Sequence, residues 1–464
     1  MKKLLLILLC LPLIGFGQNF IKEYNQNILF GIGSSVIQTS DNGYILSSSI
    51  RQSNNDSSEF GLYKIDMDGN LQWDRISGGI YGNYSADQES VFQLSDGSFI
   101  SLSKESPAIE SPLSKIRLIK RDVNGNSLWE KNYNADSCGI TPFNFAKTND
   151  GGYIIYASTN GSLTNNIDYI YLIKTDNMGV IMWTKLYNNL QLSFSNGGGS
   201  GGSAAIGTPR FGVKQTIDGG YIISGINNVF LQGMQQVQPS IAKLNQQGDI
   251  DWIQSYSLVP FNTAPLSGWF FSNSVEQTSD DGYILSGKTY ESLMGNGTSC
   301  VIKTDNGGNL EWSILDSTGI IDIKQTNDGG YIYLSNKILD TISYNREIVL
   351  NKIDALGNDL WNKSFSNCFD GFCWANSNIE QTSDGGYVLC GSSVDTITEF
   401  YSILLIKTDG NGDITSTYNI PVNSNKGELL RVTDLLGRET KGTKNEVLFY
   451  IYDDGTVEKR IVIE

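Results

Sequence analysis

The chain has 464 residues, of which 39% are hydrophobic and 18% are charged, so it can form a large core and lacks the composition of a disordered chain. The 33 Lys and Arg against 49 Asp and Glu give a net charge of −16, which would repel a phosphate backbone and excludes nucleic acid as an expected partner. The absence of His excludes Ser-His-Asp triads, His-ligated zinc and histidine pH switches.

The first 17 residues have the pattern of a secretory signal peptide. Lys2 and Lys3 precede an apolar run that ends at Phe16, and Gly15 and Gly17 supply small residues before the expected cleavage site. Cys10 would allow a lipoprotein, but the apolar run continues past it, which favours ordinary cleavage. No other stretch reaches the roughly 20 apolar residues of a transmembrane helix, so we expect no transmembrane anchor.

Two motifs alternate along the rest of the chain. The first motif is QTxDGGYI, and seven copies of it begin at Gln38, Gln93, Lys147, Gln215, Gln277, Gln325 and Gln381. The second motif is KxDxxGxxxW, and six copies of it end at Trp73, Trp129, Trp183, Trp252, Trp312 and Trp361, while a seventh has Ser416 in the Trp position. The Trp follows the aromatic residue of the first motif by 29 to 31 residues, so the repeat has a constant core.

Each motif predicts a β-hairpin, because runs of Ile, Val, Leu and Tyr flank Asp-Gly or Gly-Gly pairs that suit tight turns. Two hairpins per repeat make a four-stranded blade, so residues 18–416 predict an all-β, seven-bladed β-propeller. The segment FIKEYN, from Phe20 to Asn25, matches the outer strand WEKNYN that begins at Trp129. We expect this N-terminal strand to complete the last blade and close the ring, so removing residues 18–30 should destabilise the whole ring.

The repeats stop near Ile420, and residues 417–425 read as a linker to a small β-domain at residues 426–464. This tail contains the strand Leu429 to Asp434, the turn Gly437-Arg438, the Tyr450-Ile451-Tyr452 strand and a basic-apolar ending at Ile463. It resembles the C-terminal sorting domain of proteins exported by the type IX secretion system of Bacteroidota, and the repeats resemble those common in such exported proteins. The resemblance implies export by that machinery to the medium or the outer-membrane surface.

The residues that recur in every repeat predict blade structure rather than chemistry. Each first motif carries an Asp three residues before its aromatic residue, and each second motif carries a Lys, as in Asp150 and Lys174. A group present in all blades is typical of turn capping and ion pairing. The DxDGN-type turns lack the terminal Glu of a twelve-residue calcium loop, so we expect no metal and no cofactor.

Function is expected where the repeats differ, on the face that carries the loops of variable length. Exposed aromatic residues beside polar ones suit stacking on sugars or docking a protein. The candidate ligand-binding residues are Phe261, Trp269, Phe270, Phe372 and Trp374. The alternative is that such rings only cover the blade ends.

Cys368 and Cys373 share a short segment and are candidates for a disulfide, whereas Cys300 and Cys390 read as buried core residues.

These observations predict a monomeric, secreted or surface-displayed binding or adhesion module for extracellular polysaccharide or a surface protein. The alternative is a polysaccharide-degrading enzyme, either a lyase or a histidine-free glycosidase that uses Asp, Glu or Tyr; no catalytic residue can be chosen from the sequence. A purely structural exoprotein is a third possibility. A converging acidic pair would favour the enzyme, and an aromatic shelf would favour the binding module.

Overall fold

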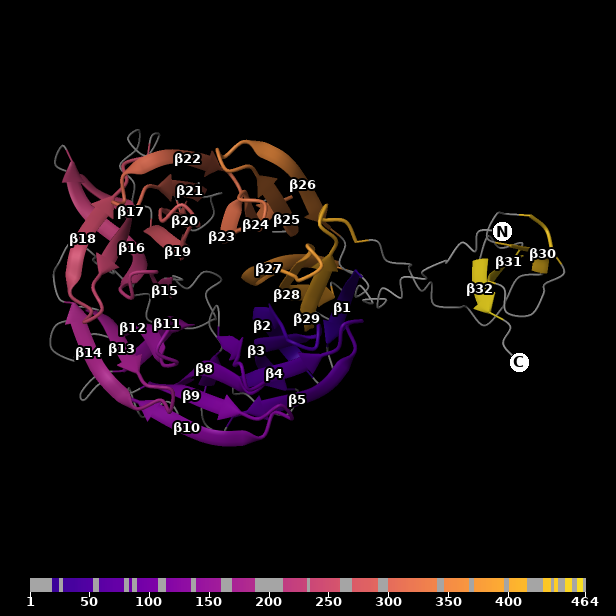
Figure 1. Cartoon of the computed structure of the whole chain (residues 1–464), viewed down its shortest axis with the longest axis horizontal. Coiled ribbons are helices and arrows are strands. Elements are labelled where there is room, and N and C mark those ends of the chain that lie inside the picture. The colour runs from indigo at the N-terminus through magenta and orange to yellow at the C-terminus, as the bar shows by residue number, and fades with distance from the viewer. Residues whose placement is uncertain are drawn as a thin grey trace, which may run out of the picture. The chain divides into compact units, whose positions relative to one another are not determined.

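The structure is a computed structural model of the whole chain (Figure 1), and its regular elements within the described residues are all β-strands. It describes residues 19–24, 28–52, 58–78, 83–85, 90–106, 114–134, 139–159, 169–187, 212–231, 234–258, 269–290, 299–339, 346–366, 371–395, 400–414, 429–434, 438–440, 447–452 and 457–461. The chain divides into two compact units, Met1–Thr415 and Ser416–Glu464. No helix in the described part of the chain has the length and hydropathy needed to span a bilayer.

Four sheets of the first unit each consist of four consecutive antiparallel strands. Their strands are β11 (Ile140–Lys147), β12 (Tyr153–Thr159), β13 (Tyr169–Thr175) and β14 (Ile181–Tyr187); β15 (Val213–Gln215), β16 (Tyr221–Leu231), β17 (Met234–Leu244) and β18 (Ile250–Ser255); β19 (Trp269–Gln277), β20 (Tyr283–Tyr290), β21 (Ser299–Thr304) and β22 (Leu310–Asp316); and β23 (Gly319–Gln325), β24 (Tyr331–Ile338), β25 (Arg346–Ile353) and β26 (Asp359–Phe365). A similar sheet is split in its first strand and contains β6 (Asn83–Ser85), β7 (Val91–Gln93), β8 (Phe99–Ser106), β9 (Lys115–Arg121) and β10 (Ser127–Tyr133).

The first and last repeats share one eight-stranded sheet. Its strands are β2 (Ile28–Gln38), β3 (Tyr44–Gln52), β4 (Glu59–Ile65) and β5 (Leu71–Ser77) from the first repeat, β27 (Gly371–Gln381), β28 (Tyr387–Asp395) and β29 (Tyr401–Thr408) from the last, and β1 (Phe20–Tyr24). A parallel bridge between Phe30 and Tyr401 joins the two groups. The strand β1 pairs antiparallel with β29 and places Phe20 opposite Lys407. Trp73 lies opposite Lys64 in the same way.

The sheets of the first unit follow one another around a common centre, as in a propeller (Figure 1). The strands β11, β15, β19, β23 and β27 lie nearest the centre, and β5, β10, β14, β18, β22 and β26 lie outside. The strand β12 is buried along its whole length, because its Ile and Tyr side chains pack on both faces, whereas β14 alternates exposed and half-buried residues. The all-β, propeller-like class follows from this layering.

The predicted hairpins are confirmed in the described residues. In the turn before β12, Thr148 N donates to Gly152 O, and Gly151 has a φ of 82°. Gly suits this left-handed conformation because it has no Cβ. Asn42 and Asp281 occupy the same place in two other copies, with φ of 63° and 66°.

Neighbouring sheets are held together by the Trp of the outer strand. The Trp73 ring packs edge-on against Phe99 of the next sheet at 5.8 Å, and a Cβ on Gly125 would lie 2.9 Å from the indole. The same edge-on packing joins Trp183 to Tyr221, Trp252 to Tyr283, Trp312 to Tyr331 and Trp361 to Tyr387. The Gly of the second motif is therefore required for a close approach as well as for its positive φ.

The N-terminal strand makes the same contacts with the first repeat. Phe20 is 5% exposed and packs edge-on against Tyr44 at 6.0 Å. The Tyr24 hydroxyl donates to Gly69 O at 2.9 Å, as Tyr133 donates to Gly179 O at 2.8 Å elsewhere. Phe20 thus takes the structural place of the Trp at this junction.

The second unit contains a three-stranded antiparallel sheet. Its strands are β30 (Leu429–Thr433), β31 (Val447–Tyr452) and β32 (Val457–Ile461). Leu448 and Tyr452 are its buried apolar side chains among the described residues, and Asp434 pairs with Arg438 at 2.7 Å. The segment expected to be a linker lies outside the described residues, as do residues 1–18.

Candidate functional site

The repeated Asp and Lys residues cap turns, as expected. The Asp150 carboxylate accepts hydrogen bonds from Thr148 Oγ1 at 2.6 Å and Gly152 N at 3.0 Å, and Lys174 Nζ lies 2.8 Å from it. Burial by itself raises the pKa of Asp150, but the hydrogen bonds outweigh it and lower the pKa to about 2. The seven corresponding pairs are Asp41–Lys64, Asp96–Lys120, Asp150–Lys174, Asp218–Lys243, Asp280–Lys303, Asp328–Lys352 and Asp384–Lys407.

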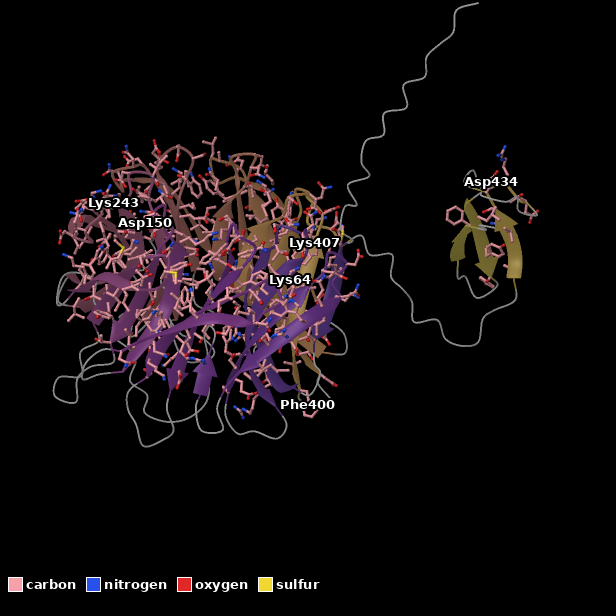
Figure 2. All side chains as sticks on the ribbon, turned by 60° about the horizontal axis from the view of Figure 1, so that its bottom comes forward. Lys64, Asp150, Lys243, Phe400, Lys407 and Asp434 are labelled. Atoms are coloured by element: carbon pink, nitrogen blue, oxygen red, sulfur yellow. The ribbon has the colours of Figure 1, made fainter. Side chains whose placement is uncertain are left out.

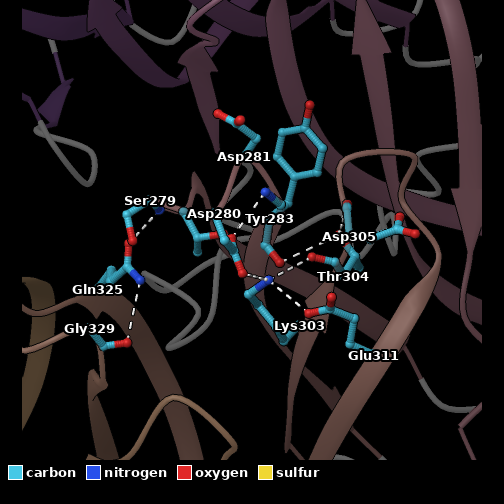
Figure 3. Close-up of polar contacts among 12 residues, drawn as sticks. Ser279, Asp280, Asp281, Tyr283, Lys303, Thr304, Asp305, Glu311, Gln325 and Gly329 are labelled. Atoms are coloured by element: carbon cyan, nitrogen blue, oxygen red, sulfur yellow. Dashed lines mark hydrogen bonds and ion pairs between the residues drawn. The ribbon is translucent and has the colours of Figure 1, made fainter.

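The Gln that begins the first motif has a role that the sequence analysis missed. Figure 3 shows Ser279 N donating to Gln325 Oε1 of the next sheet at 2.8 Å. Equivalent bonds run from Ser40 N to Gln93, Asn149 N to Gln215, Ile217 N to Gln277, Asn327 N to Gln381 and Ser383 N to Gln38. The signal was present, because Gln recurs at this position in six of the seven copies. These residues hold neighbouring sheets together.

Of the five predicted ligand-binding side chains, the structure describes one. Phe261 lies outside the described residues. Trp269 and Phe270 belong to β19, and Phe372 belongs to β27, but their side chains lie outside the described part of the structure. Trp374 is described, and its predicted exposure is wrong: it lies within β27 and is 6% exposed.

Trp374 is the buried end of an aromatic cluster that joins the last repeat to the first. Its ring packs edge-on against Tyr401 at 5.5 Å, and Tyr401 packs on Phe30 at 4.7 Å. The Arg51 guanidinium lies over the Phe30 ring at 5.9 Å. We call Phe30, Arg51, Trp374 and Tyr401, together with the exposed Phe400 that precedes Tyr401 in the chain, the junction cluster.

The junction cluster becomes more exposed from Trp374 outward. Phe30 and Tyr401 are half-buried, Arg51 is exposed, and Phe400 is 47% exposed. In Figure 2, Phe400 lies on the opposite face of the first unit from Asp150 and Lys243, which belong to the capped turns. The cluster therefore offers aromatic surface on the face of the first unit that lies away from those turns.

Sequence analysis missed Phe30, Arg51, Phe400 and Tyr401 because the contact that brings them together, between Phe30 and Tyr401, joins the first repeat to the last. A weak signal existed: Tyr401 lies six residues before the repeated Lys407, a position that Ser58 holds before Lys64. Tyr401 is thus a difference between the last repeat and the first at this position.

The cysteines differ in their environments. Cys373 is buried and disulfide-bonded, and Cys368, its expected partner, lies outside the described residues. Cys300 and Cys390 are fully buried and are not in disulfides, as predicted. Burial raises the pKa of the Cys300 thiol to about 12, so it stays protonated and unreactive at neutral pH.

Hydrogen bonds and ion pairs lower the pKa of several carboxyl groups at the described surface, as at Asp150 and Glu130. Side-chain bonds from Arg117, for example, outweigh burial at Glu130. A glycosidase acid would need a raised pKa to hold its proton at neutral pH.

No protein-family model matches the chain, and no curated protein sequence matches it significantly. Solved structures are similar to it at low identity. The polysaccharide lyase Uly1 is 9% identical with a TM-score of 0.48, covering 85% of this chain and 92% of that one. The NanB sialidase of Streptococcus pneumoniae is 10% identical with a TM-score of 0.43, covering 85% and 71%. A protein of unknown function from Dyadobacter fermentans is 12% identical with a TM-score of 0.40, covering 74% and 98%.

Proposed function

We propose that the chain is a secreted or surface-displayed seven-bladed β-propeller that binds an extracellular polysaccharide through the junction cluster. The observation that carries the proposal is the graded exposure of the cluster, from the buried Trp374 to the exposed Phe400 and Arg51. Rings held by packing from behind present rigid apolar faces at low entropic cost, and the C–H face of a sugar ring packs on such faces. A surface protein is the other ligand class expected from the sequence.

The proposed ring has seven blades, with β1 as the outer strand of the last. This is supported by the pairing of β1 with β29 and by the packing of Phe20 on Tyr44. It is also supported by the hydrogen bond from Ser383 N to Gln38 Oε1 at 2.7 Å, which repeats the bond between other neighbouring sheets. Contacts of both the outer and the inner strands thus connect the last repeat to the first.

The export route is part of the proposal. The signal-peptide pattern of residues 1–17 and the sorting-domain resemblance of residues 426–464 support secretion through a type IX system. The small three-stranded sheet of β30, β31 and β32 is a unit that a transport machinery can recognise apart from the ring. Deleting residues 426–464 should leave the chain in the periplasm, which fractionation of the producing cells measures.

The test of binding uses the purified mature chain and a panel of soluble and insoluble polysaccharides. Retention and released sugar are scored in one assay, so that a binding module and an enzyme give different results. The Phe400→Ala variant should lose retention, and Leu360→Ala is the matched control because Leu360 is a 56% exposed apolar side chain on the outer strand β26. Released sugar would replace the proposal with the enzyme alternative, and no retention on any polysaccharide would refute it in favour of a protein ligand.

A further inference from the structure

Arg51 distinguishes the junction cluster from other aromatic contacts of the protein. It lies near the end of β3, directly opposite Phe30 in the β2–β3 ladder. Its contact among the described residues is with the Phe30 ring, and within that part of the chain the guanidinium makes no hydrogen bond or ion pair. The five N–H donors of an exposed arginine are therefore available to a ligand.

Arg75 and Arg117 use their guanidinium donors within the protein. Arg75 also lies over an aromatic ring, 5.2 Å from the centre of Trp73, but it donates to Asp74 O at 2.6 Å and to Asn124 O. Arg117 forms a two-pronged pair with Glu130 at 2.9 and 3.0 Å. Stacking on a ring is thus common to Arg75 and Arg51, and the free guanidinium is what sets Arg51 apart.

The net charge of the whole chain means that an acidic ligand would have to be held by a short-range contact with this arginine. A net charge of −16 repels a polyanion at long range, so no general attraction would hold an acidic polymer to the surface. A guanidinium instead recognises a carboxylate or sulfate by two parallel hydrogen bonds at short range. The neighbouring Phe30 and Tyr401 rings provide an apolar face for the sugar that carries the acidic group.

We propose that the junction cluster binds an acidic polysaccharide, with Arg51 paired to a carboxylate or sulfate, the sugar ring packed on Phe30 and Tyr401, and the exposed Phe400 beside them in contact with the polymer. This inference rests on the proposed binding function and adds the chemical class of the ligand. It predicts that the acidic form of a polymer binds more tightly than a neutral form with the same backbone. The preference should be roughly tenfold, because a charge-assisted hydrogen bond contributes about that factor.

The experiment measures binding of the mature chain to two matched pairs of polymers by affinity electrophoresis. The pairs are polygalacturonate with its methyl ester, and dextran sulfate with dextran. The Arg51→Gln variant should lose the preference for the acidic member but keep the binding to the neutral one. Arg75→Gln is the matched control, since it removes the same charge from a stacked arginine and should leave the preference unchanged. Raising the salt concentration should reduce the preference of the wild type.

The outcomes separate this inference from the proposed function. Equal binding within both pairs, with Phe400→Ala still losing affinity, would overturn the acidic preference and leave polysaccharide binding in place. An acidic preference that survives Arg51→Gln would overturn the assignment of Arg51. No binding to any of the four polymers would overturn both. An unchanged thermal melt of Arg51→Gln establishes that its effect is on the ligand, because the side chain is exposed.

Discussion

Phe20 provides the sharpest test of how the ring is held together. Its side chain is 5% exposed and packs on Tyr44, and a Cβ on Gly69 would lie 2.9 Å from its ring. Replacing a buried Phe with Ala removes the transfer free energy of the ring and leaves a cavity, which costs about 3–5 kcal/mol. We expect Phe20→Ala to lower the free energy of unfolding of the whole ring by this amount, because β1 would no longer join the last repeat to the first.

Urea denaturation followed by tryptophan fluorescence measures this loss as a lower midpoint. Tyr24→Phe separates the hydrogen bond to Gly69 O from the ring packing, and its expected cost is about 0.5–1.5 kcal/mol. Leu360→Ala is the control on an outer strand and should stay within about 0.5 kcal/mol of the wild type. The reasoning is refuted if Phe20→Ala unfolds at the wild-type midpoint while Trp361→Ala, at the matching position of another sheet, is strongly destabilised.

Three further predictions follow from the turns. The pKa of Asp150 is lowered to about 2, so its contribution to stability is present above the unfolded pKa near 4 and is lost as the pH falls toward 2. Thr148→Val removes a donor to Asp150 and should start acid unfolding at a higher pH, which circular dichroism against pH would show. Asn42→Gly should stabilise the ring by up to about 1 kcal/mol, because Asn42 has a φ of 63°, and a lower urea midpoint would contradict this. Gly412→Ala should cost more than Gly329→Ala: both have positive φ, but a Cβ on Gly412 would lie 2.7 Å from an indole, whereas Gly329 has nothing within 4 Å.

The features of the fold that the sequence predicted, its turns and strands, depend on residues that are close together in the chain. The positive φ of Gly151 and the apolar run of β12 depend on neighbouring residues in the chain, and both follow from the motif QTxDGGYI. The role of the Gln in the same motif was not predicted, because its partner is an amide of another sheet. The bond from Ser383 to Gln38 spans 345 residues and exists only once the sheets are arranged around a centre.

The candidate site was likewise predicted only in part from the sequence. The sequence alone predicted that aromatic residues at which the repeats differ would bind a ligand, and Trp374 was one of them. Only the tertiary structure showed that Trp374 is buried by Tyr401 and that Phe30 and Arg51 continue the contact outward. The physical reason is that the bridge between Phe30 and Tyr401 sets which strand ends meet, and no pattern along the chain encodes that pairing. The repeat pattern in the sequence thus determined the strands, turns and repeated contacts, while the packing of the last repeat on the first decided which side chains form a surface.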